Sequence, residues 1–413
     1  MRIFPSAAHA RGEREWHMRC TTSRMRIHLR EIVLACASTL LASCGGSPAA
    51  QSTGDGAPAA QGTGSSGTGS SPVGDAPPGG VAATDAGPVA AGDAGDAGPP
   101  GDVLRAIFDG VDRAQLKARL DELTGATPVT ANGASVRITE RWSPAAKASF
   151  RAYWSAYMAA LGAKVNDVPF AVPDLVGETQ GHTVEAVLPG DSPDSVVIIV
   201  HYDSVGVTGK ETENPAADDD GSGLAMQMEA ARLFAAHAGR HNTVRFVAAD
   251  YEEISDNLAG DVAYVAYLQK AAKDQGFKIL VASDDDQTGW SCWSEGLCGS
   301  GAPAANSTFQ MISCSGDSKN YDYPELTAGI TQIAAAYSTM KISAVCDGSG
   351  DTDHYPFWQA GIPAYVIEEY GSENNPHYDD TGDATLAHID LDYLLHVSQI
   401  QIAFQAKLVG ITR

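Results

Sequence analysis

Residues 195–203 read SVVIIVHYD, an apolar run of β-branched residues that ends at His201. A short continuous run of this kind is typical of a strand that is buried on both faces of a parallel sheet. Similar runs follow at Val244–Ala249, Ile279–Ala282 and Ala364–Ile367, and helix-like segments lie between them. This alternation predicts an α/β fold, a mostly parallel mixed sheet with helices on both faces.

Polar side chains follow each of the four predicted strands. Ligands of open α/β sheets bind at the carboxyl ends of the strands, so we expect these side chains to share one site. They are His201 and Asp203 after the first strand, Glu252 and Glu253 after the second, Asp284, Asp285 and Asp286 after the third, and residues 368–380 after the fourth.

His201 and Asp203 are two positions apart at a strand end, so both side chains should point to the same side. A histidine that binds a metal usually has its other ring nitrogen held by a carboxylate, and Asp203 is placed for that. Taken alone, the triplet also fits a core histidine beside a surface aspartate. The paired carboxylates of Glu252 and Glu253 could divide metal binding and proton transfer between them, or simply face solvent.

An acidic turn, Asp218-Asp219-Asp220-Gly221-Ser222-Gly223, precedes a helix-like segment. Three adjacent carboxylates repel one another unless a cation lies among them. A solvated acidic loop is the simpler alternative. A calcium loop of the EF-hand type is a poor match, because its ligands occupy alternate positions and these are contiguous.

The ordered set His-x-Asp, Asp-Asp-Gly-Ser-Gly, Glu-Glu, Asp-x-x-Gly and a late histidine resembles the zinc exopeptidases of metallopeptidase family 28, which includes bacterial secreted aminopeptidases. The resemblance covers roughly residues 183–386. It implies the zinc-exopeptidase (phosphorylase/hydrolase-like) architecture, two zinc ions, and a peptide substrate with a free N-terminus.

The resemblance also implies a role for each matching residue. His201 would bind one zinc ion and Asp203 would orient it. Asp219 would bridge the two ions, and in the family a cis peptide bond follows this residue. Glu252 would be the general base that accepts a proton from the attacking water, and Glu253 would bind the other ion.

Two ligand positions keep alternatives. Asp286 begins the Asp-x-x-Gly and matches the family's next aspartate best, although Asp284 and Asp285 are close enough to compete. The last ligand of the family is a histidine shortly after an Asn-Pro pair. We assign His377, since imidazole is the expected group, while a strict register would place Asp379 there.

Other functions fit the same residues less well. A single-zinc glutaminyl cyclase, a carboxypeptidase or a dipeptidase on this fold would use similar ligands. A non-catalytic surface protein on the same scaffold should lack ligands or the base, and Glu252 is present. A serine hydrolase is disfavoured because the sequence has no Gly-x-Ser-x-Gly elbow.

The N-terminal quarter has the composition of an export signal and a tether. Basic Arg26 and Arg30 precede a short apolar stretch that ends in Leu-Ala-Ser-Cys44 and resembles a lipobox, although an ordinary secretory signal remains the alternative. The predicted organisation is a signal segment at 1–44, a disordered Gly/Ala/Ser/Pro tether at 45–102, and a peptidase domain at 103–413 that begins with helical segments at 103–123 and 143–161. An extracytoplasmic protein that contacts a membrane only through lipidated Cys44 is expected.

The formal net charge is −24, from 51 acidic and 27 basic residues, which disfavours nucleic acid and anionic lipid surfaces as partners. Of the seven cysteines, four lie outside the N-terminal quarter, and an exported protein would join them in two disulfides. Three pairings are possible, and Cys292–Cys298 with Cys314–Cys346 would close the shortest loops. A tetracysteine zinc site is the alternative, but no Cys-x-x-Cys occurs.

Overall fold

The computed structural model describes residues 102–205, 212–255, 257–316, 321–346, 352–377, 383 and 386–412. The expected signal segment, and the expected tether up to residue 101, lie outside these residues. None of the helices within the described ranges is both long and apolar enough to cross a membrane.

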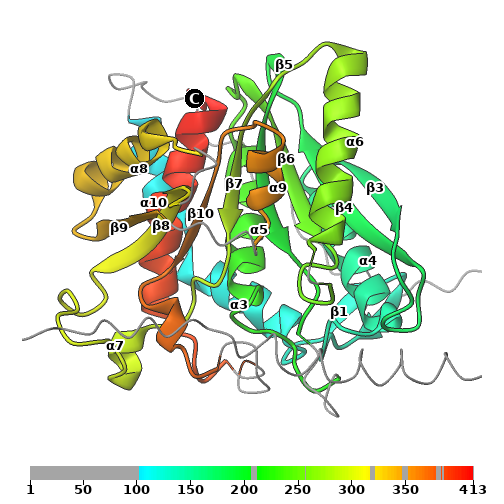
Figure 1. Ribbon diagram of the computed structural model, residues 1–413, viewed down its shortest axis with the longest axis horizontal. Coiled ribbons are helices and arrows are strands. Elements are labelled where there is room, and N and C mark those ends of the chain that lie inside the picture. The colour runs from blue at the N-terminus through cyan, green and yellow to red at the C-terminus, as the bar shows by residue number, and fades with distance from the viewer. Residues whose placement is uncertain are drawn as a thin grey trace, which may run out of the picture. The chain divides into compact units, whose positions relative to one another are not determined.

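An eight-stranded mixed sheet organises the described residues (Figure 1). Its strand order is β3-β4-β6-β5-β7-β10-β8-β9. The central strands β6, β5, β7 and β10 are parallel, whereas β3, β4 and β8 pair antiparallel with their inner neighbours, and β9 runs parallel to β8. The strands are β3 Lys164–Ala171, β4 Gln180–Leu188, β5 Ser192–His201, β6 Asn242–Ala249, β7 Ile279–Asp285, β8 Thr308–Cys314, β9 Lys341–Cys346 and β10 Ala364–Glu369.

Strand β5 separates two hydrophobic cores. Val196, Ile198 and Val200 belong to the larger core, while Val197 and Ile199 belong to the smaller one. Successive side chains of a strand point to opposite faces, so an unbroken apolar run can be buried on both sides. The α/β class and the four predicted strands are therefore confirmed.

Helices cover both faces of the sheet (Figure 1). The larger core takes apolar residues from α2, α3, α4, α5, α8 and α10, and the smaller core takes them from α6 and α9. The helices are α2 Val103–Gly110, α3 Arg113–Leu123, α4 Pro144–Ala160, α5 Gly221–Ala236, α6 Ala259–Gln275, α7 Cys292–Glu295, α8 Pro324–Tyr337, α9 Tyr355–Gln359 and α10 Leu391–Val409, with a short hairpin of β1 Val129–Ala131 and β2 Ala134–Val136.

The segment before β4 matches the expected helices with one difference. Helix α4 begins after Ser143, whose side chain accepts a hydrogen bond from the Ala146 amide, as an N-cap does. The apolar pattern over 103–123 forms two helices instead of one. Helix α2 ends at Gly110, and Asp112 then caps α3 by accepting from the Ala114 amide.

Two disulfides join Cys292 to Cys298 and Cys314 to Cys346, so the prediction of two disulfides is confirmed, and of the three possible pairings the structure has the one with the shortest loops. The second bond links β8 to β9 at one edge of the sheet.

We expect the two disulfides to contribute unequally to stability. Their sequence separations are 32 for Cys314–Cys346 and 6 for Cys292–Cys298. A longer loop restricts the unfolded chain more, so replacing the first pair with serines should lower the free energy of unfolding by about 4 kcal/mol, against about 2 kcal/mol for the second. Urea denaturation of the two double variants measures this, and equal losses would contradict the prediction.

Candidate metal centre

His201 is the last residue of β5 and is buried. Its Nε2 lies 2.9 Å from Asp219 Oδ1 and 3.8 Å from Asp286 Oδ1. Its Nδ1 lies 3.1 Å from the backbone carbonyl of Asp203. A carbonyl only accepts, so Nδ1 carries a proton, and Nε2 is the ring nitrogen that faces the carboxylate oxygens and could bind a metal.

Asp203 therefore orients His201 through its backbone oxygen, since its carboxylate Oδ1 is 3.9 Å from Nδ1. The carboxylate has a different task. It accepts hydrogen bonds from the amides of Glu252, Glu253 and Ile254, at 3.1, 3.0 and 3.1 Å. Three charge-assisted bonds fix the turn after β6, so Asp203 positions the two glutamates relative to His201.

Asp219 lies in the turn before α5, where the Asp219–Asp220 peptide bond is cis, as the family resemblance implied. Asp220 caps α5 by accepting from the Gly223 amide at 2.8 Å. Gly223 is required for close approach, because a Cβ there would lie 1.9 Å from the Asp285 carbonyl oxygen. His201, Asp220 and Asp286 each offer a ligand atom within 4.8 Å of the others, so Asp220 lies beside two of the predicted ligands as well as capping α5.

Asp284, Asp285 and Asp286 each contact a different set of partners. Asp285 points to α10, where it accepts from Gln405 at 2.8 Å and from Gln401. Asp284 accepts from the His354 amide at 3.0 Å. Asp286 is the one that approaches His201, which favours it as the ligand. The hydroxyl of Thr352 lies 2.9 Å from Asp284 Oδ2 and 3.0 Å from Asp286 Oδ2, and so links the two carboxylates.

The donor set fits divalent cations. Within the described ranges, Glu253 Oε1, Asp286 Oδ1 and Asp220 Oδ2 are buried and have no hydrogen-bond partner. Burial opposes a charge on His201, but Glu252 and the nearby aspartates outweigh it and raise the pKa of His201 well above its usual value. Burial also raises the pKa of Glu252 well above its usual value. The charge of His201 opposes this increase, and the charge of Glu253 adds to it. Carboxylates and an imidazole at such a density need positive charge, and these are the ligand types that zinc takes.

Two further carboxylates brace the acidic turn, and no sequence pattern pointed to their roles. Asp218 accepts from the amides of Gly289 and Trp290 at 2.7 and 3.1 Å, which ties the turn to the loop that follows Asp286. Asp383 accepts from the amides of Asp218 and Asp219 at 2.7 and 3.2 Å. The ligands are thus held by residues far away in the chain.

Arg141 joins two of the ligand loops from the segment before α4. It is fully buried. Its guanidinium donates to the carbonyl oxygen of Tyr202 at 2.5 Å, to that of Ala216 at 3.0 Å and to that of Pro215. Tyr202 follows His201, and Ala216 precedes the acidic turn. The N-terminal segment is consequently part of the site's framework, which an arginine in a polar stretch of sequence could not reveal.

The structure places His377 beside Glu295 and not beside His201. Its Nε2 lies 3.1 Å from each carboxylate oxygen of Glu295, and its ring stacks on that of His388. Among the residues that the structure describes, no contact joins His377 to His201 or Asp219. Its role as the last ligand stays a prediction, and Asp379 lies outside the described residues.

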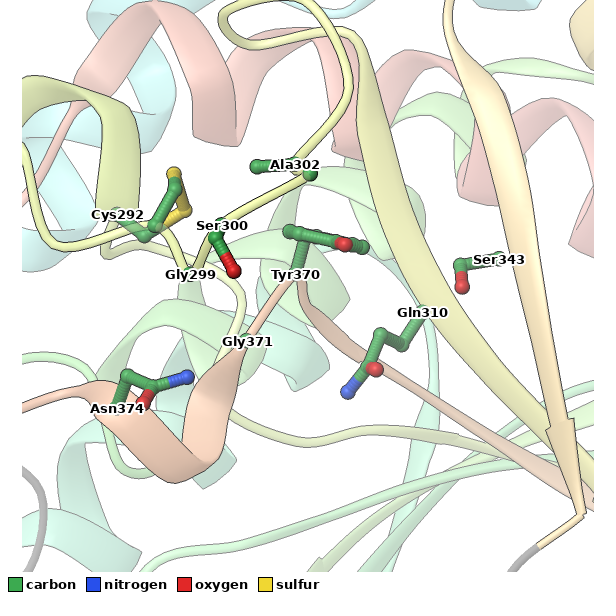
Figure 2. A pocket seen from close by; sticks show the side chains of 11 residues that line it. Cys292, Gly299, Ser300, Ala302, Gln310, Ser343, Tyr370, Gly371 and Asn374 are labelled. Atoms are coloured by element: carbon green, nitrogen blue, oxygen red, sulfur yellow. A yellow bond between two sulfur atoms is a disulfide. The ribbon is translucent and has the colours of Figure 1, made fainter. Parts of the chain in front are cut away.

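A cavity of 230 Å³ lies beside the Cys292–Cys298 disulfide (Figure 2). Tyr370, Asn374 and Gln310 present polar groups to it. The predicted ligands are not among the described residues that line this cavity, so it is separate from the metal centre.

Known proteins resemble this chain in sequence and in fold. The chain is 26% identical over 235 residues to leucine aminopeptidase 1 of Grosmannia clavigera, which covers 55% of this chain and 53% of that protein. It thus spans about half the length of this relative. Its fold resembles a zinc aminopeptidase from Bacillus subtilis (TM-score 0.57, 15% identity, 72% of this chain and 95% of that chain). It also resembles the glutaminyl cyclase of Macrostomum lignano (TM-score 0.57, 16% identity, 75% and 94%).

At these identities the solved structures show the fold alone. The sequence profile of Peptidase family M28 matches residues 183–405, which is more than half of the chain. This range contains all the predicted metal ligands, from His201 to His377. The chain therefore belongs to Peptidase family M28.

Proposed function

We propose that this protein is an aminopeptidase that holds two zinc ions and removes N-terminal residues from peptides. The observation that carries the proposal is the convergence of His201, Asp219 and Asp286 beside the Glu252–Glu253 turn, with buried carboxylate oxygens that lack partners among the described residues. Membership of a peptidase family supports the reaction class, and the similarity to a leucine aminopeptidase supports the choice of exopeptidase.

The residues that would hold the ions are His201, Asp219, Glu253 and Asp286. A fifth ligand would come from residues 377–380, for which His377 and Asp379 are the candidates. Zinc at such a site lowers the pKa of water to about 7 and polarises a carbonyl group. The hydrogen bonds that Asp203 accepts from the amides of the Glu252–Ile254 turn, and the one that Thr352 donates to Asp286, keep the side chains in place for this.

Glu252 is the proposed general base. It would take a proton from the attacking water and pass it to the nitrogen of the leaving amine. The backbone amide of Glu252 donates to Asp203, so the position of this carboxylate is set by the same residue that orients His201.

The substrate is proposed to carry a free, positively charged N-terminus. Around His201 the buried acidic groups outnumber the buried cations, and an ammonium group is attracted to such surroundings. An N-blocked peptide would lack this attraction.

We further propose that the protein acts outside the cytoplasm and is anchored by a lipid on Cys44. The support is the sequence alone, namely the basic and apolar order before Cys44 and the tether composition after it. Metabolic labelling with a radioactive fatty acid tests the anchor, and a Cys44→Ser variant that is labelled as strongly as the unaltered chain would refute it.

Three assays with the purified full chain test the activity. Amino-acid p-nitroanilides should be hydrolysed, the same compounds with blocked amines should not, and peptides that begin with glutamine should be shortened instead of cyclised. Cyclisation of N-terminal glutamine without hydrolysis would favour a glutaminyl cyclase, an alternative that the similarity to the Macrostomum lignano enzyme makes specific. Cleavage of blocked peptides alone would exclude an aminopeptidase.

Removal of the metal should lower stability as well as activity. A ligand that binds only the folded state stabilises it, by about 2.7 kcal/mol when its concentration is 100 times its Kd. We therefore expect the chelator-treated protein to unfold at lower urea concentration and zinc to restore both stability and hydrolysis. Magnesium is the control, because it prefers oxygen ligands in an octahedral arrangement. If zinc left the unfolding midpoint unchanged, the proposed centre would be wrong.

A further inference from the structure

A second group of metal-binding side chains lies apart from His201. Glu295 at the end of α7, His377 after the 3-10 turn Ser372–Asn374, and His388 before α10 each offer a ligand atom within 4.8 Å of the other two. His388 Nδ1 is 2.8 Å from Glu295 Oε1, and His377 Nε2 is 3.1 Å from both oxygens.

The two imidazole rings lie face to face, with centroids 3.4 Å apart and planes inclined by 26°. Both rings therefore direct a nitrogen at one carboxylate. A carboxylate and two imidazole rings that converge in this way are ligand types that zinc takes.

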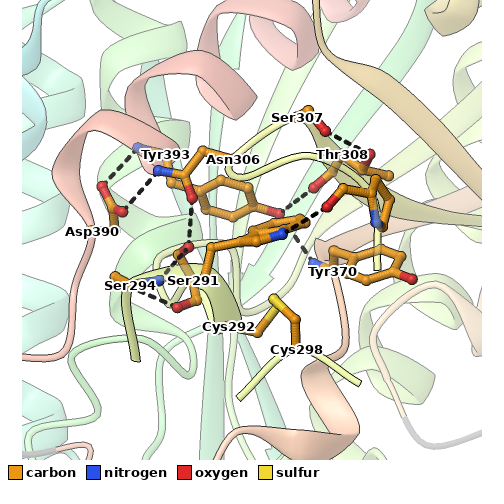
Figure 3. The surroundings of a disulfide bond; sticks show 12 residues. Ser291, Cys292, Ser294, Cys298, Asn306, Ser307, Thr308, Tyr370, Asp390 and Tyr393 are labelled. Carbon is orange, nitrogen blue, oxygen red and sulfur yellow. Dashed lines mark hydrogen bonds between the residues drawn. A yellow bond between two sulfur atoms is a disulfide. The ribbon is translucent and has the colours of Figure 1, made fainter. Parts of the chain in front are cut away.

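The backbone around Glu295 and His388 is braced, as Figure 3 shows around the neighbouring disulfide. Ser291 caps α7 and donates to Asn306 Oδ1 at 2.6 Å, and Asn306 donates to Asp390 at 3.0 Å. Asp390 in turn caps α10 two residues after His388. A site whose supports are already fixed loses little freedom when it binds an ion.

His377 is held as well. Its backbone amide donates to Asn375 Oδ1 at 2.9 Å, and the Asn375 amide group donates to Glu369 at 3.0 Å and to Asp218 at 3.3 Å. The three side chains remain 20%, 25% and 32% exposed for His377, Glu295 and His388, so an ion can enter from solvent.

We propose that Glu295, His377 and His388 form a third divalent-metal site of the zinc type, separate from the proposed pair. Two histidines and one glutamate are a known zinc ligand set, with a fourth position left to water. The ion would tie α7 to the segment after Asn375. Because His377 would bind this ion, the fifth ligand of the proposed zinc pair would be Asp379.

The test counts zinc ions in the full chain, prepared without a histidine tag, stripped with a chelator, reloaded with zinc and freed of excess metal. Mass spectrometry of the bound metal should find three ions per chain in the unaltered protein and two in Glu295→Gln and in His388→Ala. His396→Ala is the matched control, since this histidine is exposed on α10, and it should keep three. His388 is not among the proposed catalytic residues, so hydrolysis should persist in its variant.

Equal zinc counts in the unaltered chain and in both variants would overturn the proposal, because Glu295 and His388 would then be a hydrogen-bonded pair without an ion. The unfolding midpoints of the metal-free forms show whether each variant folds. If His388→Ala does not fold, the zinc count of Glu295→Gln alone decides. A Glu253→Gln variant separates the two ideas. If the unaltered chain held a single ion that His388→Ala removed and Glu253→Gln did not, the third site would stand and the two-zinc centre would fall.

Discussion

Replacing Glu252 with glutamine is expected to lower kcat roughly 10²–10⁴-fold, the range in which a general base contributes. Glutamine has the same shape but cannot take the proton of the attacking water. The backbone amide that donates to Asp203 is unchanged, so the turn should keep its conformation. Steady-state kinetics on an amino-acid p-nitroanilide, beside a zinc count of the same sample, measures the effect.

The control for this variant is Glu325→Gln, an exposed glutamate in the first turn of α8. It should leave kcat and the zinc count unchanged. A Glu252→Gln protein that keeps the full zinc count and the full kcat would exclude Glu252 as the base. A loss of zinc together with activity would instead make Glu252 a metal ligand.

Replacing Arg141 with methionine should strongly lower the stability of the folded protein. Its guanidinium lies in a fully buried place and donates to the backbone oxygens of residues 202, 215 and 216. Methionine fills much of the volume but leaves these oxygens, and the negative charge of Asp383 and Asp220 nearby, without their partner. Loss of one member of a buried charged network costs about 3–5 kcal/mol, which we expect as the decrease in the free energy of unfolding.

Urea denaturation of the chelator-treated protein isolates this effect from metal binding. Arg137→Met is the matched control in the same segment. Arg137 is exposed and also donates to two carbonyl oxygens, those of Gly125 and Ala126, so its loss should change stability by no more than about 0.5 kcal/mol. Equal losses in the two variants would contradict a special role for Arg141. Weaker zinc binding in Arg141→Met alone would support its link to both ligand loops.

The sequence alone was sufficient for the local parts of this protein. The apolar run before His201 predicted a strand buried on both faces, because a side chain on either face of β5 meets a hydrophobic core. The helical spacing of apolar residues at 143–161 predicted α4, which Ser143 caps in the structure, since both the spacing and the cap depend on neighbouring residues only. The spacing of His201, Asp219 and Glu252 indicated the family, because each motif occupies a single loop.

Only the tertiary structure decided which side chains meet. It turned Asp285 toward Gln405 and Asp286 toward His201, a choice that depends on which face of β7 borders α10. It also placed His377 against Glu295, whereas its neighbours in sequence suggested the zinc pair. These outcomes depend on contacts between residues far apart in the chain, and no local pattern encodes such contacts.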